Sequence, residues 1–265
     1  MMMKILVCAK RVLDTTDVNL KMDPVRGTLI KEGVPSILNP DDANALEAAL
    51  TMKDANPGTT VTILTMGAPA AKFMIRECLA MGADDAYFLS DHAFGGADTY
   101  ATSVTLEYGI RKIGDFDLIL AGRQSIVGDT AQVGPQLAQR LGLPLVTYAQ
   151  DIKIKEGKAI VQRQLEDGYE VIETPLPCLI TAVKELNTPR YMSGGGIVDA
   201  YEKEIITLDH NDIDLPVQRC GLEASPTRVV RSFAPELKGQ GEMLKGTPQE
   251  MARTLVAKLE EKNVW

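Results

Sequence analysis

The chain has 265 residues, of which 45% are hydrophobic, and it carries 28 basic and 36 acidic side chains, for a net charge of −8. This length suits one large domain or two with a complete core, and the acidic balance argues against binding to nucleic acid or to an anionic membrane surface. The apolar run within Met1–Lys10 is too short for a signal peptide or a membrane span, so we expect a cytoplasmic protein without membrane insertion.

Strand-like and helix-like patterns alternate through the first 150 residues, which predicts a parallel sheet covered by helices. The predicted strands are Lys4–Ala9, Val61–Met66, Ala86–Leu89, Asp117–Ala121 and Leu145–Tyr148. If the first strand is central and the fourth is its neighbour, the strand order reverses between Ala9 and Gly122. Ligands bind at such a point, beyond the carboxyl ends of the strands.

Two helices are predicted between the first three strands. Asn39–Asp42 reads as a helix start, with Asn39 as the cap, a proline in the first turn and two acids near the positive end of the helix dipole. Asn56–Gly58 ends this helix. A second helix carries an apolar stripe and ends at Gly82, a residue type typical of the position after a helix.

The stretch Gly122–Gly134 follows the fourth strand and opens another helical pattern. A strand that leads through small residues into a helix presents free backbone N–H groups and the positive end of the dipole, which together suit a phosphate. An ordinary strand-to-helix loop is the alternative, because short glycine patterns are often coincidental.

The pattern changes after residue 151. Asp151–Ile154 and Ala159–Gln164 read as a hairpin, and Tyr169–Thr174 and Leu179–Val183 as further strands. The segment from Lys184 to Gly196 has no period and ends in three glycines, which predicts an exposed, mobile loop.

The C-terminal part reads as an arm followed by a helix. Residues 213–246 are irregular and rich in proline and glycine, which indicates either disorder or a segment held by a partner. Thr247–Glu250 reads as a capping box, followed by Met251, Leu255 and Leu259 at helical spacing. We expect an α/β domain over residues 1–212 and a docking arm over residues 213–265, although the apolar stripe could equally pack on the chain's own domain.

Metal and thiol chemistry have few candidate residues. None of the cysteines or histidines has a partner at the spacing of a zinc site, an iron–sulfur cluster, a redox dithiol or a catalytic triad. We expect no metal site, histidines on surface turns, and core packing for the thiols of Cys8 and Cys78, which lie inside apolar patterns. The cysteines and histidines are Cys8, Cys78, Cys178, Cys220, His92 and His210.

Several motifs in this order resemble those of the beta subunits of electron-transferring flavoproteins, and the resemblance covers essentially the whole chain. The motifs are Lys10-Arg11, Asn39-Pro40-Asp41, Met81-Gly82-Ala83-Asp84, Asp98–Thr102, Gly122–Gly134, Pro177–Thr181 and Leu186–Tyr191. The resemblance implies a doubly wound α/β fold of the adenine-nucleotide-binding kind, of the flavodoxin-like and Rossmann-like type, with added antiparallel strands. It also implies a larger alpha subunit that carries an electron-transfer FAD.

The resemblance further implies which residues contact an adenine nucleotide. Asn39 and Asp41 would meet ribose hydroxyls, and Met66 and Ile126 would offer apolar faces to the adenine. The N–H groups of Gly128–Gln132 would hold phosphates. The complete set is Ala9, Asn39, Pro40, Asp41, Asp42, Met66, Arg123, Gln124, Ser125, Ile126, Val127, Gly128, Asp129, Thr130, Ala131, Gln132, Val133 and Gly134.

Members of this family hold either a structural AMP or a second FAD at that position. Ile126–Pro135 resembles the loop of electron-bifurcating members, because housekeeping members carry a bulkier and more acidic run there; Val127 departs from the expected acid or glycine. This implies a FAD that accepts hydride from NADH. One electron would pass to the alpha-subunit flavin and an acyl-CoA dehydrogenase type of flavoenzyme, and the other to ferredoxin or flavodoxin. No side chain need act as a catalytic residue.

The segment Lys184–Met192 resembles the family's recognition loop. The resemblance implies that Leu186 is an exposed anchor for the partner dehydrogenase, with Asn187, Pro189 and Arg190 beside it.

Three alternatives remain. The first is a housekeeping subunit with AMP and no NADH oxidation. The second is an ATP-using enzyme of the adenine-nucleotide hydrolase fold, suggested by Gly95–Thr99, although Asp98 and Thr99 more simply cap a helix. The third is a stand-alone binding module.

Overall fold

The computed structural model describes residues 2–14, 34–230 and 241–264. Within this part of the chain, residues 2–14 and 34–230 form one compact unit and residues 241–264 belong to a second. Residues 213–230 therefore pack with the larger unit, whereas the sequence placed the division after residue 212. The physical reason is that Ile213, Leu215 and Cys220 are buried in the core of the larger unit.

A mostly parallel sheet of nine strands forms the centre of the larger unit, in the order β11-β5-β4-β1-β6-β10-β7-β8-β9. Pairing is parallel from β11 to β7 and antiparallel for β8 and β9. This confirms the predicted fold class. The strands are β1 (Lys4–Cys8), β4 (Thr60–Met66), β5 (Asp85–Leu89), β6 (Leu118–Gly122), β7 (Leu145–Lys155), β8 (Lys158–Leu165), β9 (Gly168–Pro175), β10 (Cys178–Ala182) and β11 (Ile205–Leu208).

Strand β1 is central, with β4 on one side and β6 on the other. Ile5 lies opposite Val61 of β4 and Leu118 of β6. The strand order therefore reverses between β1 and β6, as predicted. A separate antiparallel pair, β2 (Arg11–Leu13) and β3 (Ser36–Leu38), follows β1 and precedes the first helix.

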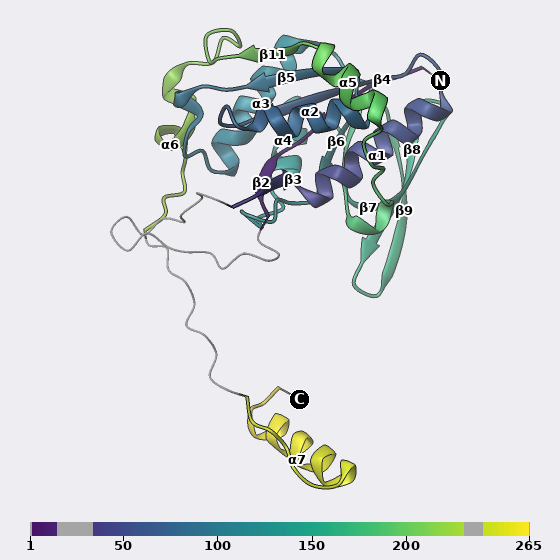
Figure 1. Ribbon diagram of the computed structural model, residues 1–265, viewed down its shortest axis with the longest axis vertical. Helices are drawn as coiled ribbons and strands as arrows, with labels where there is room; N and C mark the ends of the chain where they lie inside the picture. The colour runs from purple at the N-terminus through teal and green to yellow at the C-terminus, as the bar shows by residue number, and fades with distance from the viewer. Residues whose placement is uncertain (1, 15–33, 231–240, 265) are drawn as a thin grey trace. The chain divides into compact units, whose positions relative to one another are not determined.

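Helices cover both faces of the sheet (Figure 1). Alternate residues of β1 point to opposite faces, so Ile5 and Val7 pack with α1, α2 and α5, whereas Leu6 packs with α3 and α4. The helices are α1 (Pro40–Ala55), α2 (Ala71–Met81), α3 (Thr99–Ile113), α4 (Val133–Leu141), α5 (Gly194–Glu202) and α6 (Gly221–Ala224), with short 3₁₀ helices η1 (His92–Phe94), η2 (Lys184–Leu186) and η3 (Val217–Arg219).

The three glycines that were expected to close a mobile loop instead begin α5. The Ser193 hydroxyl caps this helix by accepting a hydrogen bond from Gly196 N at 2.9 Å. A side chain at Gly196 would place its Cβ 2.3 Å from Ala80 O of α2. Glycine is therefore required because α5 packs closely on α2, and the loop after β10 ends at Ser193.

The second unit contains helix α7 (Pro248–Glu261). The predicted capping box is confirmed, since Thr247 and Glu250 each accept a backbone N–H of the other. No residue of α7 is buried, and Leu255 is 49% exposed. No described helix is both long enough and apolar enough to cross a bilayer.

Candidate functional site

Three segments meet where β1 and β6 end, and the carboxylate of Asp42 joins them. Asp42 lies in the first turn of α1, where its Oδ2 accepts a hydrogen bond from Lys10 N at 2.8 Å and its Oδ1 accepts one from Gly122 N at 2.9 Å. Asp42 thus ties the end of β1 to the end of β6 across the point where the strand order reverses. The side chain is buried and occupied, so it holds the site together instead of facing a ligand.

Burial raises the pKa of two side chains, Asp42 at the start of α1 and Cys8 at the end of β1. Removal from solvent raises the pKa of Asp42 to about 7, although the N–H groups of Lys10 and Gly122 act to lower it. Burial, with the Asp42 charge as a smaller cause, raises the pKa of the Cys8 thiol to about 12. The raised pKa disfavours the thiolate form of Cys8 at neutral pH, although the residue is only half-buried.

Asn39 holds the loop that follows β6. Its amide donates to Gln124 O at 2.8 Å, and its Oδ1 accepts from Ile126 N at 3.1 Å. Asn39 is the N-cap residue of α1, as predicted, but its side chain makes no capping hydrogen bond. With 1% of its surface exposed, Asn39 fixes the shape of the loop from the side of α1.

Asp41 and Arg123 form an ion pair at the mouth of this junction. Arg123 Nε lies 3.3 Å from Asp41 Oδ2, without the geometry of a hydrogen bond. The Arg123 guanidinium also lies over the ring of Tyr148, with its carbon 5.9 Å from the ring centroid. Burial raises the pKa of Asp41, while the charge of Arg123 opposes this shift.

The loop between Arg123 and Gly134 leaves a run of donors free. Asp129 N bonds to Ser125 O at 2.8 Å, and the side chains of Gln124 and Asp129 bond to each other. Asp129 and Ala131 adopt positive φ values of 52° and 53°. No acceptor in the described part of the chain takes the N–H groups of Gly128, Thr130, Ala131, Gln132, Val133 and Gly134. We name this run, Gly128–Gly134, the cradle.

The glycines of this region have different environments. A Cβ at Gly122 would lie 2.4 Å from Asp42 Oδ1, and one at Gly134 would lie 2.7 Å from Thr181 Cγ2. These two glycines permit α1 and α4 to pack against the sheet. A Cβ at Gly128 would meet no described atom within 4 Å, so the described part of the chain leaves the space beside Gly128 open.

The remaining predicted contact residues lie along the same edge with different exposure. Ala9 is 6% exposed and its N–H bonds to Leu64 O, so it contributes to the floor of the site. Met66 is half-buried at the end of β4, whereas Ile126 and Val127 are 46% and 59% exposed. Pro40 is exposed beside them.

The start of α3 bounds the cradle on the other side. Thr99 Oγ1 donates to Gln132 Oε1 at 3.2 Å. Asp98 caps α3 by accepting from Ala101 N at 3.0 Å, and its other oxygen accepts from Thr227 N at 2.9 Å. Both oxygens of Asp98 thus accept backbone hydrogen bonds, which confirms its capping role.

The predicted partner-binding residues are bound to α1. Arg190 forms a double hydrogen bond with Glu47, Nε to Oε2 at 2.8 Å and one terminal nitrogen to Oε1 at 2.9 Å, and Arg190 N donates to Oε2 at 3.0 Å. Asn44 and Asn187 exchange side-chain-to-carbonyl bonds of 2.7 and 2.9 Å. Asn187 and Arg190 therefore hold their own loop in place. We name these two pairs the latch.

Leu186 is not the exposed side chain that was expected. It is half-buried and packs on the core beneath α1, and Pro189 is also half-buried. Tyr191, which the sequence did not single out, is 97% exposed.

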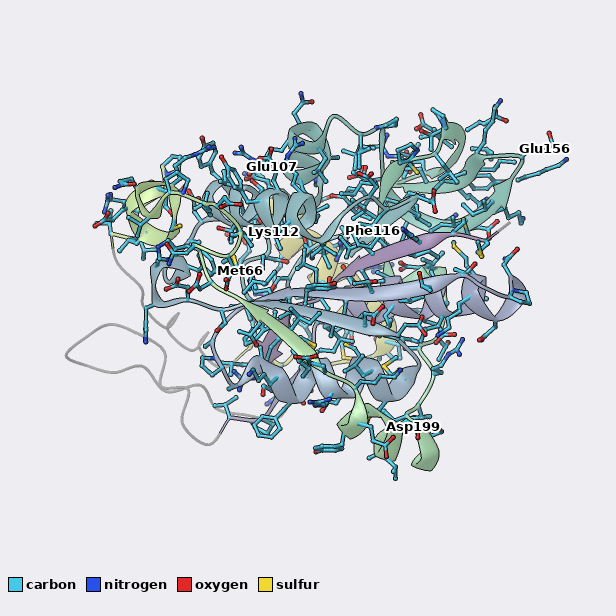
Figure 2. The ribbon with its side chains drawn as sticks, turned by 90° about the horizontal axis from the view of Figure 1, so that it is seen from above. Met66, Glu107, Lys112, Phe116, Glu156 and Asp199 are labelled. Carbon is cyan, nitrogen blue, oxygen red and sulfur yellow. The ribbon has the colours of Figure 1, made fainter. Side chains whose placement is uncertain are left out.

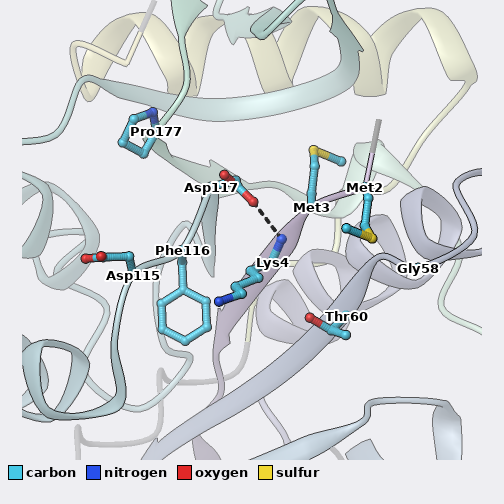
Figure 3. Close-up of a pocket in the computed structure, with 9 residues that line it drawn as sticks. All are labelled: Met2, Met3, Lys4, Gly58, Thr60, Asp115, Phe116, Asp117 and Pro177. Carbon is cyan, nitrogen blue, oxygen red and sulfur yellow. Dashed lines mark hydrogen bonds between the residues drawn. The ribbon is translucent and has the colours of Figure 1, made fainter.

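A hollow of about 430 Å³ lies at the opposite end of the parallel strands (Figure 3). It is lined by residues that begin or precede strands, among them Lys4, Thr60, Phe116 and Asp117, and Lys4 N donates to Asp117 Oδ2 at 2.8 Å. Figure 2 shows Phe116 and Met66 toward different ends of the sheet. The hollow is thus separate from the cradle.

His210 has a partner that sequence spacing does not show. Its Nδ1 lies 2.6 Å from Asp91 Oδ2, and its N–H also donates to this oxygen. The N–H of Ala93 and the His210 contact together lower the pKa of Asp91 to about 2. This pair ties the segment after β11 to the end of β5. All four cysteines are free thiols, and Cys78, Cys178 and Cys220 are buried. Burial was predicted for Cys78 and for Cys8, but Cys8 is only half-buried.

Comparison with known proteins shows the family of this chain. A family model described as the electron transfer flavoprotein domain matches residues 26–213. The chain belongs to the electron transfer flavoprotein family. It is 51% identical to the electron transfer flavoprotein subunit beta of Clostridium acetobutylicum, over 98% of this chain and 99% of that protein.

Two further relatives of this electron transfer flavoprotein are parts of named complexes. The caffeyl-CoA reductase-Etf complex subunit CarD of Acetobacterium woodii is 66% identical over 99% of this chain and all of that protein. The acryloyl-CoA reductase electron transfer subunit gamma of Anaerotignum propionicum is 45% identical over 99% of this chain and all of that protein. The chain thus groups with the beta subunits of the family.

Proposed function

We propose that this beta subunit binds FAD in the cradle and works in a heterodimer with an alpha subunit that carries a second FAD. The observation that carries the proposal is the cradle, in which every N–H except that of Asp129 meets no acceptor in the described part of the chain, and which leads into the N-terminus of α4. Such a run binds phosphate through hydrogen bonds and through the helix dipole. The terminal nitrogens of Arg123 add a positive charge at the same edge.

The charge and space of the loop favour a dinucleotide over AMP. Asp129 is the one acidic residue between Arg123 and Gly134, and its carboxylate is bonded to Gln124. Gly128 has open space around it, and Ile126 and Val127 expose apolar surface for an aromatic ring system. These features support room for a second phosphate without electrostatic repulsion.

The chain's own residues position the cofactor and set its electrostatic environment. Asp42 fixes the strand ends, Asn39 fixes the loop, and Arg123 offers charge. A bound flavin would supply the redox chemistry, with NADH as hydride donor and with single electrons leaving toward the alpha-subunit FAD and toward ferredoxin or flavodoxin. No nucleophile or general acid from this chain is required.

The partner dehydrogenase is proposed to be an acyl-CoA flavoenzyme. The names of two relatives support this, since each includes an acyl-CoA reductase. We also propose that the second unit docks on the alpha subunit, because Met251, Leu255 and Leu259 form an apolar stripe on a helix with no buried residue.

The nucleotide content of the purified heterodimer tests the proposal. Heat release followed by chromatography should give two FAD per heterodimer. One FAD with one AMP would overturn the FAD assignment and NADH oxidation while keeping the nucleotide site. One FAD with no further nucleotide, together with no binding of added FAD or AMP, would overturn the nucleotide site itself.

The docking role of α7 has a separate test. Leu255→Glu should weaken association with the alpha subunit, measured by size-exclusion chromatography over a dilution series. Ala257→Glu, on an exposed position of the same helix, is the charge-matched control. Equal association of both variants and the unmodified chain would contradict docking through the apolar stripe.

A further inference from the structure

Tyr148 adopts a backbone conformation that an aromatic residue rarely takes. Its φ is 59°, in the left-handed region. The pairing of β7 with β10 shifts register beside it, between Ile180 and Ala182, and Tyr148 N donates to Thr181 Oγ1 at 3.1 Å. Glycine or asparagine would adopt this φ with less strain. The backbone conformation alone therefore does not explain why a tyrosine stands at this position.

The backbone of Tyr148 places its ring at the carboxyl ends of β6 and β10. Arg123 N donates to Ala182 O at 2.8 Å, and Val183 N donates to Ala149 O at 3.2 Å. Arg123 and Tyr148 are therefore neighbours through β10, although they are far apart in sequence. Their side chains meet with the guanidinium over the ring.

Two contacts restrict the Arg123 side chain while leaving its donors free. Nε lies 3.3 Å from Asp41 Oδ2 on one side, and the ring of Tyr148 faces the guanidinium on another. The terminal nitrogens of Arg123 meet no acceptor among the described residues, and the side chain is 34% exposed. A guanidinium held in this way keeps a fork of donors suited to phosphate oxygens.

We propose that Tyr148 is a positioning residue of the nucleotide site, whose ring holds the Arg123 guanidinium toward the phosphate of the bound nucleotide. This inference rests on the proposed function. Strain of this kind persists where the surrounding structure requires the side chain, and it is frequent at ligand sites. Tyr148 acts through Arg123, so its contribution depends on the arginine being present.

The test measures the affinity of the nucleotide-depleted heterodimer for FAD and for AMP by isothermal titration calorimetry. Tyr148→Phe keeps the ring and should leave both dissociation constants within about twofold of the unmodified protein. Tyr148→Gly removes the ring and relieves the strain, so it should weaken binding about tenfold while the melting temperature stays equal or rises. A purely structural residue would show the reverse, with unchanged affinity.

A double-mutant cycle checks the route through Arg123. In an Arg123→Gln background, Tyr148→Gly should cause no further loss of affinity. Tyr148→Asn, which tolerates positive φ, replaces the glycine variant if that variant does not fold.

The outcomes separate this inference from the proposed function. Absence of FAD and AMP binding to the unmodified heterodimer would overturn the proposed function. Normal binding with no loss in Tyr148→Gly or Tyr148→Asn would overturn the role of Tyr148 alone. Equal losses in Tyr148→Phe and Tyr148→Gly would assign the effect to the hydroxyl and overturn the role of the ring.

Discussion

Helix α1 contacts two loops to which the sequence analysis assigned binding residues. The two loops differ in how many of their polar groups are bonded to α1. The start of α1, through Asn39 and Asp42, fixes only the beginning of the loop after β6. Apart from Asp129 N, the N–H groups of the cradle therefore meet no acceptor among the described residues. In the middle of α1, Asn44 and Glu47 form hydrogen bonds with Asn187 and Arg190 of the loop after β10. A polar side chain in a loop can therefore be assigned to binding only after its hydrogen-bond partners within the chain are known.

The glycine pair Gly122 and Gly128 gives the largest expected contrast within one loop. Gly122→Ala should lower the free energy of unfolding by about 3 kcal/mol, because its Cβ would collide with Asp42 and with backbone of α1. Gly128→Ala should change it by no more than about 0.5 kcal/mol, since its Cβ would enter open space. Urea denaturation measures both. Equal losses would mean that the exposed part of the loop is packed as tightly as its beginning.

The latch should be the next most sensitive feature. Glu47→Gln should cost about 2 kcal/mol in unfolding free energy, because it removes the charge from a double hydrogen bond to Arg190 at a buried site. Asp54→Asn removes an exposed partner of the same arginine and should cost no more than about 0.5 kcal/mol.

The pH dependence of the latch has a definite sign. Burial acts to raise the pKa of Glu47, but the bonds and charge of Arg190 outweigh it and lower the pKa below 4.5. The stabilisation is therefore present above pH 4.5 and is lost as the pH falls through the lowered pKa. In Glu47→Gln the free energy of unfolding should not show this loss at low pH. A pH dependence below pH 4.5 identical to that of the unmodified protein would contradict the latch.

Asp42 should produce the opposite pH dependence. Its folded pKa of about 7 lies above the ordinary value of 3.8, so the folded state holds a proton that the unfolded state has released between these values. Stability from this group therefore falls as pH rises from about 4 to 7, by at most about 1.4 kcal/mol per unit. Asp42→Asn should remove that slope, as measured by urea denaturation at several pH values. If the free energy of unfolding changed equally with pH in Asp42→Asn and in the unmodified protein, the raised pKa of Asp42 would be contradicted.

The smallest effects on stability are expected where the loop after β10 faces solvent. Tyr191→Ala should change the unfolding free energy by no more than about 0.5 kcal/mol. We expect it to slow electron transfer to the partner dehydrogenase, because a large exposed aromatic side chain suits an interface.

Leu186→Ala tests the original prediction for the same loop. It should leave flavin content and NADH reduction intact and slow transfer to the dehydrogenase, but it should also cost about 2 kcal/mol in stability, because Leu186 packs on the core. Unchanged steady-state transfer in Leu186→Ala would remove this residue as an anchor, and unchanged transfer in Tyr191→Ala would do the same for the tyrosine.

The sequence alone determined the arrangement of the sheet and the segments that meet at its edge. Apolar runs predict strands, and residues such as Gly82 and Asp98 mark the ends of helices. These signals depend on only a few neighbouring residues, so they can be read from the sequence. The strand reversal was predicted on the condition that the first strand is central and the fourth is its neighbour, and the pairing of β1 with β6 meets this condition. The position of the cradle after β6 followed from the same rule about parallel sheets.

Only the tertiary structure decided what each polar side chain at these places does. Asn39 is a helix cap by local pattern but binds a loop that lies 85 residues further along the chain, and Arg190 binds Glu47 across 143 residues. Tyr148 and Arg123 meet because β10, the last of these strands in sequence, lies between β6 and β7. Hydrogen bonds and ring contacts form between neighbours in space, and local sequence patterns report neighbours only along the chain.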